Sequence, residues 1–127
     1  MLKQKMTSDK TRMITSAVAY LRFKGYHEIK ALLAGFDNPQ AVFRKASEAG
    51  YTPDLIAQKD FGIHLFEVVD APGDFSPEWL ERWSVYADYA ERKQGKFYLI
   101  AYSEDADLVS EKIEGLEPAP LILKIRR

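Results

Sequence analysis

Apolar residues recur at helical spacing near the start of the chain, at Ile14, Ala17, Val18 and Leu21. Intervals of three and four residues place these side chains on one face of a helix. Ser8 or Asp9 can cap this helix. It is expected to end near Lys24, because Gly25 accepts the left-handed backbone conformation that terminates helices. Residues 1–8 are expected to be a disordered start.

The pattern over residues 26–33 is ambiguous. Apolar positions alternate as in a strand, at Ile29, Ala31 and Leu33. The composition also permits a helix. A strand is favoured because residues 35–39 then form a turn. We expect a short helix over residues 39–48, with Asn38 as its cap and a proline at its first position.

Two β-rich runs follow, joined by a polar connection that contains a glycine. They predict an antiparallel hairpin with strands near residues 54–58 and 63–70. Beyond the hairpin, Ser76 and Pro77 open the strongest helix of the chain. Its apolar stripe consists of Trp79, Leu80, Trp83, Tyr86, Ala87 and Ala90.

The last third of the chain alternates between strand and helix. Residues 97–102 are a continuous apolar run, typical of a buried central strand. Ser103 is expected to cap a further helix that ends at Gly115, and residues 121–125 form a last strand. The fold class is therefore α/β: residues 1–127 form a single domain with a mixed β-sheet flanked by helices on both faces.

Composition narrows the class of protein. With 127 residues, 46% of them apolar, the chain can build one domain with a core. The absence of cysteine excludes disulfides and thiolate sites. No apolar run approaches ~20 residues, so no membrane partner is expected. The basic start is not followed by an apolar leader, and a cytoplasmic location is expected by default.

Two carboxylates stand on the strands of the predicted hairpin. Asp54 opens the first apolar run and Glu67 lies inside the second. Opposite positions of a hairpin share a face and lie a few ångströms apart. By alternation, Glu67 shares its face with Leu65 and Val69. A carboxylate on an apolar face is unfavourable without a partner, which makes Glu67 the foremost candidate for a functional residue. An ion pair with a nearby Lys or Arg, or a position at the sheet edge, explains Glu67 equally well.

These residues resemble the motif of the PD-(D/E)XK nuclease superfamily, which has the restriction-endonuclease-like fold. Pro53-Asp54 matches the first part of the motif and Glu67-Val68-Val69 the second, with Val69 at the lysine position. The resemblance extends over residues 9–102, through a leading helix, a strand, the hairpin, a helix and an apolar strand. It implies a restriction-endonuclease-like core in which Asp54 and Glu67 hold Mg²⁺ beside DNA.

The resemblance also implies that this metal site is incomplete. In the family the lysine positions or activates the attacking water, which Val69 cannot do. Another lysine would have to take its place, and the candidates are Lys30, Lys59 and Lys93. Lys30 is the first choice, because Lys59 is at the far end of the hairpin from Glu67. The leading helix has apolar and hydroxyl residues where many members carry an acid.

Contacts with nucleic acid are a separate question. Basic residues gather around the first helix, at Lys3, Lys5, Lys10, Arg12, Arg22 and Lys24. Of these, Lys10 and Arg12 are the candidates for DNA phosphate contacts. A solvated helix face explains the same pattern. The formal net charge is −1, so there is no overall basic excess. His64 lies on the strand face opposite Glu67 and belongs to no spaced ligand motif.

Two hypotheses follow. In the first, the chain is a Mg²⁺-dependent DNA endonuclease with a relocated catalytic lysine. In the second, it is a nuclease-like domain with an incomplete metal site, non-catalytic or weakly active, which binds nucleic acid, a protein partner or a second copy of itself. The retained Asp54 and Glu67 favour the first. The replacement of the lysine by Val69 and the near-neutral charge favour the second.

Overall fold

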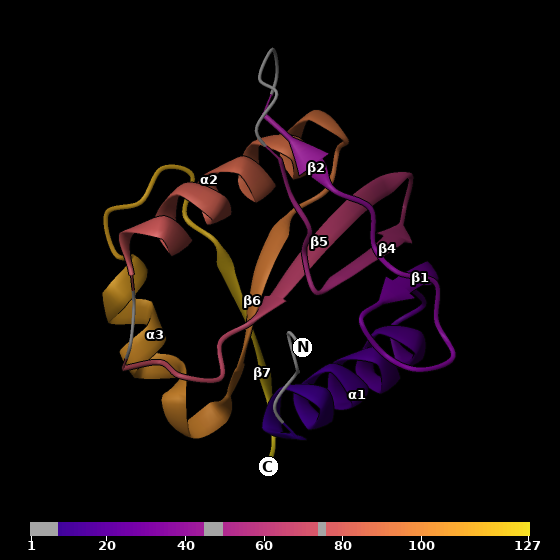
Figure 1. Ribbon diagram of the computed structural model, residues 1–127, viewed down its shortest axis with the longest axis horizontal. Coiled ribbons are helices and arrows are strands. Elements are labelled where there is room, and N and C mark those ends of the chain that lie inside the picture. Colours follow the sequence, from indigo (N-terminus) through magenta and orange to yellow (C-terminus); the bar gives the residue numbers. More distant parts are fainter. Residues whose placement is uncertain (1–7, 45–49, 74–75) are drawn as a thin grey trace, which may run out of the picture.

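Five strands form one mixed sheet in the order β1-β4-β5-β6-β7 (Figure 1). Their bounds are β1 His27–Ala31, β4 Leu55–Lys59, β5 Gly62–Val68, β6 Phe97–Tyr102 and β7 Leu121–Ile125. The first three pair antiparallel, whereas β5, β6 and β7 run parallel. The computed structural model describes residues 8–44, 50–73 and 76–127.

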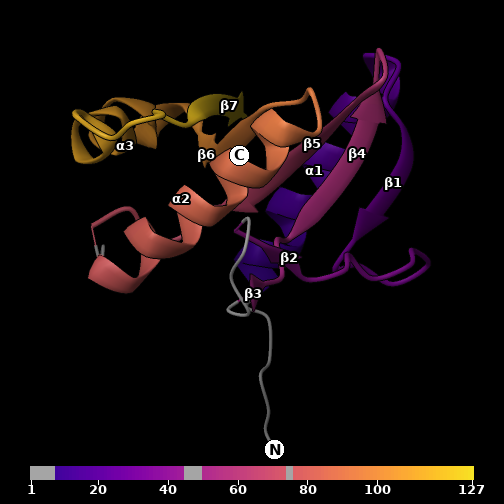
Figure 2. The ribbon, with the colours of Figure 1, turned by 90° about the horizontal axis from the view of Figure 1, so that it is seen from above.

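Helices cover both faces of this sheet. Their bounds are α1 Ser8–Phe23, α2 Pro77–Arg92 and α3 Ala106–Ile113. In Figures 1 and 2, α1 lies on one side of the sheet, and α2 and α3 lie on the other. Within the described residues, no helix is long and apolar enough to cross a membrane.

Strand alternation divides the apolar side chains between two cores. On β5, Phe66 and Val68 pack with α1, whereas Leu65 and the following Val69 pack with α2. The buried side chains of both cores are almost fully excluded from water. Because successive strand residues point to opposite faces, the apolar runs of β5 and β6 serve both cores at once. This explains why β6 is a continuous apolar segment in the sequence.

Most of the predicted elements are present. The helix predicted near the start is α1, the ambiguous segment is strand β1, and the predicted hairpin is β4 and β5. The helix after Ser76, the apolar strand and the last strand are also confirmed. Of the expected disordered start, Ser8 begins α1, and residues 1–7 lie outside the described part of the chain.

The short helix expected over residues 39–48 is wrong where the structure describes it. Val42 and Phe43 form strand β2, which pairs antiparallel with β3, Gly50–Tyr51. Contacts with α2 favour the extended chain: Val42 is buried in the core beside α2, and the Phe43 carbonyl accepts a hydrogen bond from Arg92 at 2.6 Å. Residues 45–49 of the expected helix lie outside the described residues.

The third helix also differs at its start. Ser103 begins a 3-10 turn over residues 103–105, and α3 follows at Ala106. The Ser103 hydroxyl donates to the Ile125 carbonyl at 3.4 Å and so ties the turn to the last strand instead of capping a helix.

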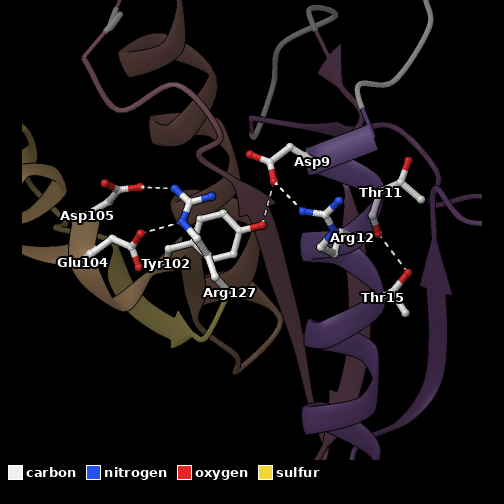
Figure 3. A network of polar contacts seen from close by, with 8 residues as sticks. All are labelled: Asp9, Thr11, Arg12, Thr15, Tyr102, Glu104, Asp105 and Arg127. Atoms are coloured by element: carbon white, nitrogen blue, oxygen red, sulfur yellow. Dashed lines mark hydrogen bonds and ion pairs between the residues drawn. The ribbon is translucent and has the colours of Figure 1, made fainter.

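A polar network joins α1 to the end of the chain (Figure 3). The Tyr102 hydroxyl donates to Asp9 Oδ1 at 2.8 Å, and Arg12 lies 3.6 Å from the same oxygen. Arg127 stacks on the Tyr102 ring at 4.1 Å and pairs with Glu104. Arg12, a candidate for DNA contacts, is therefore engaged by an acid of its own helix.

The turn into β6 approaches the start of β5 very closely. A Cβ added to Gly95 would lie 1.8 Å from the Ile63 carbonyl oxygen, so the backbone would have to move. Gly95→Ala should therefore destabilise the protein by roughly 1–3 kcal/mol or more in urea unfolding. Gly73→Ala is the matched control, because a Cβ there meets nothing within 4 Å. Equal stability of the two variants would contradict this close approach.

Candidate functional site

Asp54 and Glu67 meet at one end of the β4–β5 hairpin. Leu55 of β4 pairs with Phe66 of β5. Asp54 directly precedes Leu55 in the chain, and Glu67 directly follows Phe66. By alternation, both carboxylates belong to the sheet face that packs against α2. The negative charge of Asp54 acts on Glu67, which places the two groups within electrostatic range. The structure thus brings together the two acids that the hairpin prediction paired.

Asp54 is 3% exposed, and each of its two carboxylate oxygens has a partner. Its Oδ1 lies 3.1 Å from Lys10 Nζ, and its Oδ2 accepts the Val68 N–H at 2.9 Å. Its backbone carbonyl accepts the N–H of Leu32 at 3.1 Å. One residue therefore connects α1, β5 and the segment after β1. An ion pair and a backbone hydrogen bond together offset the cost of burying the carboxylate.

Glu67 is held by α2. It is 7% exposed, and its Oε2 accepts the indole N–H of Trp83 at 3.2 Å and lies 3.3 Å from Arg82 Nε. Burial, and after it repulsion from Asp54, raise the pKa of Glu67 to about 7 against the opposing effects of Arg82 and Trp83. Glu67 therefore exchanges a proton near neutral pH.

Tyr86 completes the surroundings of Glu67. Its side chain is fully buried, and burial together with the nearby Glu67 charge raises the pKa of the phenol well above its usual range. Its hydroxyl has no hydrogen bond of normal geometry to the described residues. Tyr86 is thus a neutral group at this site, and it packs edge-on against Phe97 at 5.3 Å.

Val69, at the lysine position of the motif, is part of the core. It is 1% exposed and packs in the cluster beside α2, and its N–H donates to the Ile100 carbonyl at 2.9 Å. An aliphatic side chain in this position supplies no charge and no proton to the carboxylates.

The other lysine candidates lie elsewhere. Lys30, the first choice from sequence, donates to Gln40 Oε1 at 3.4 Å. Lys59 lies over the Tyr26 ring at 5.1 Å, and Lys93 over the Tyr89 ring at 5.6 Å. The lysine that reaches Asp54 is Lys10, which sequence reasoning assigned to DNA phosphates.

Sequence reasoning did not identify which two cations accompany the carboxylates. Lys10 and Arg82 are separated from Asp54 and Glu67 by 44 and 15 residues along the chain. No local spacing links either pair. The one available signal was the cost of burying Glu67 unpaired, which required a cation from some neighbouring helix.

The donor set does not fit a resident Mg²⁺. Mg²⁺ prefers octahedral oxygen coordination and keeps several of its waters, which need space at the carboxylates. Asp54 and Glu67 are almost completely buried and are already accompanied by Lys10 and Arg82. Among the described residues, no group of three or more His, Cys, Asp or Glu side chains could hold a metal. His64 is on the opposite face and accepts the Lys96 N–H at 3.1 Å.

Comparison with known proteins leaves the family open. No family model matches the chain, and neither curated proteins nor solved structures give a significant match. Function must therefore be argued from the residues of this site and from the surface of the domain.

The raised pKa of Glu67 predicts a pH-dependent stability. The folded protein holds this proton up to about pH 7, whereas the unfolded chain releases it near 4.5. The stabilising contribution is therefore complete below pH 4.5 and is lost as the pH rises to 7. Relative to Glu67→Gln, which stays neutral, the wild-type protein should lose about 2 kcal/mol of unfolding free energy between pH 5 and pH 8.

Urea unfolding at several pH values measures this difference. Glu111→Gln is the control, because it removes one negative charge from an exposed position on α3. If the unfolding free energy of the wild type minus that of Glu67→Gln stays flat or rises as the pH rises, the assignment of a raised pKa is wrong.

Proposed function

We propose that this chain is a non-catalytic nuclease-like domain that binds nucleic acid or a partner protein. It has a restriction-endonuclease-like core in which the motif acids have become internal ion-pair anchors. One observation carries the proposal: Asp54 and Glu67 are buried, and each is engaged by a cation from a different helix, Lys10 of α1 and Arg82 of α2.

The order of elements supports this core. A leading helix, a strand, a hairpin with both acids at one end, a helix and a parallel strand follow one another as the resemblance implies. The fold by itself decides nothing about activity, because one fold carries many functions. The chemistry of the site must decide.

That chemistry opposes hydrolysis. Attack on a phosphodiester needs a positioned water and a positive group near the developing charge, and losing one such group commonly lowers the rate by ~10²–10³. Val69 provides neither. Lys10 and Arg82 already balance the two carboxylates, so a divalent cation would have to displace them. The ion pairs therefore act as structural links between the helices and the hairpin.

The structural role of Lys10 predicts a large loss of stability. Lys10→Met leaves Asp54 buried without its cation and should cost roughly 3 kcal/mol in urea unfolding. Arg12→Met is the matched control, because its partner Asp9 has a side chain that is 39% exposed. That exposed pair should contribute less than ~1 kcal/mol. Equal effects of the two substitutions would argue against an anchoring role for Asp54.

The absence of turnover is tested directly. Plasmid and single-stranded DNA are incubated with Mg²⁺ or Mn²⁺ and with wild type, Glu67→Gln or Val69→Lys. We expect no cleavage by the wild-type protein above the level of Glu67→Gln. Robust wild-type cleavage that Glu67→Gln abolishes would overturn the proposal.

The second candidate function is an active Mg²⁺-dependent DNA endonuclease with a relocated lysine. It is favoured by the 3.1 Å distance from Lys10 Nζ to Asp54 Oδ1, which puts a positive group beside a motif acid. If the wild type does cleave DNA, Lys10→Met should abolish cleavage at temperatures where the variant is folded. Lys30→Met should leave it intact, because Lys30 contacts Gln40 instead.

A further inference from the structure

A hollow of about 260 Å³ opens on the sheet face that packs against α1, which is the face opposite Glu67. It lies between the C-terminal end of α1 and the sheet. We call it the aromatic hollow, and its aromatic and basic lining residues are Tyr20, Lys24, Tyr26, Lys59, Phe66 and Tyr98. Leucine side chains complete the lining, which contains no acidic residue.

The floor of the aromatic hollow is a set of packed rings. Phe66 and Tyr98 stack with centroids 5.1 Å apart and planes 11° apart, and Tyr26 meets Phe66 edge-on at 5.9 Å. His64 extends this set and is 5.5 Å from Tyr26. Burial lowers the pKa of His64, and its Nδ1 accepts a backbone N–H. The floor is therefore a set of aromatic rings, of which Phe66 is buried and Tyr26 and Tyr98 are partly exposed.

The rim carries positive charge. Lys24 Nζ lies 5.6 Å above the Tyr20 ring, and Lys59 Nζ lies 5.1 Å above the Tyr26 ring. These cation–π contacts hold two ammonium groups beside aromatic surfaces. Asp60 adjoins Lys59 in sequence, and its charge acts on Tyr26, so it partly offsets the basic rim.

Exposed aromatics flank both rim lysines in sequence. Phe23, next to Lys24, is 85% exposed, and Phe61, two residues after Lys59, is 97% exposed. Exposed rings close in sequence to the rim lysines are compatible with a ligand that has both aromatic and anionic parts.

We propose that the aromatic hollow binds single-stranded nucleic acid, with one base stacked on its rings and the neighbouring phosphates held by Lys24 and Lys59. This inference rests on the proposed function and assigns its binding surface. An unpaired base offers a flat ring to stack on the aromatic floor, and its backbone supplies the anions that match the rim. In a duplex the bases are paired and stacked, and they cannot enter the hollow. The volume of about 260 Å³ suits one flat group.

Fluorescence anisotropy of a labelled oligothymidine at low salt tests the proposal. Lys24→Glu combined with Lys59→Glu should weaken binding ~10-fold or more, because two phosphate contacts become repulsive. Lys112→Glu is the matched control, since Lys112 is an exposed lysine of α3.

The Asp60→Asn variant, changed at an exposed position, should bind the oligonucleotide more tightly by ~2-fold or more. An abasic oligonucleotide of equal length should bind ~10-fold more weakly than oligothymidine.

Circular dichroism melting of each variant confirms that it is folded before binding is measured. Three results would overturn the proposal: no binding by the wild type, equal binding by the double variant and Lys112→Glu, or equal affinity for the abasic strand. Self-association that the double variant abolishes, without oligonucleotide binding, would also overturn it and assign the surface to a second copy of the chain. The cleavage assay tests Glu67, which lies on the opposite face of the sheet from the aromatic hollow. Glu67-dependent cleavage would therefore refute the proposed function without affecting the proposal that the aromatic hollow binds a single strand.

Discussion

Burial of two carboxylates at one end of a hairpin is the constraint on which this domain depends. Neither Asp54 nor Glu67 can be withdrawn from water unless each acquires a partner. The partners come from helices on opposite faces of the sheet, Lys10 from α1 and Arg82 from α2. Asp54 also accepts the Val68 N–H and so fixes β4 against β5. Three layers are thereby joined through one polar cluster, and both cores are positioned by it.

The same cluster shows how two carboxylates can be held in the interior of a domain by side chains alone. Each acid has a cation close to it, so the pair contributes to packing between the helices and the hairpin. At Val69, an aliphatic side chain suits the core beside α2 better than a charged one would.

Much of the fold could be predicted from local patterns. The hairpin, the helix after Ser76 and the apolar strand of residues 97–102 each carry a strong signal within a few residues. Residues 39–44 were misread, because Asn38-Pro39 is a good helix start by local rules, while Val42 is drawn into the core by α2. Tertiary burial outweighed local propensity there.

Of the candidate site, only the placement of the two carboxylates could be predicted from the sequence. Alternation along a hairpin places Asp54 and Glu67 on one face without reference to the rest of the chain. The partners of these acids depend on how helices cross the sheet, which no spacing in the sequence encodes. For this reason Lys10 was assigned to DNA and Lys30 to the acids. The aromatic hollow was missed for the same reason, since its rings come from α1, Tyr26, β5 and β6.

The position of α1 also has a consequence for how the domain assembles. Its apolar stripe packs with Ile100, Tyr102 and Ile125, residues that follow it by 79 positions or more. During synthesis, α1 leaves the ribosome long before these partners exist, and until β6 and β7 emerge its stripe can pack only against β1, β4 and β5. Contacts of such large sequence separation slow folding, because a long loop must close before they form. The early half of the chain therefore completes its core only when the late half arrives.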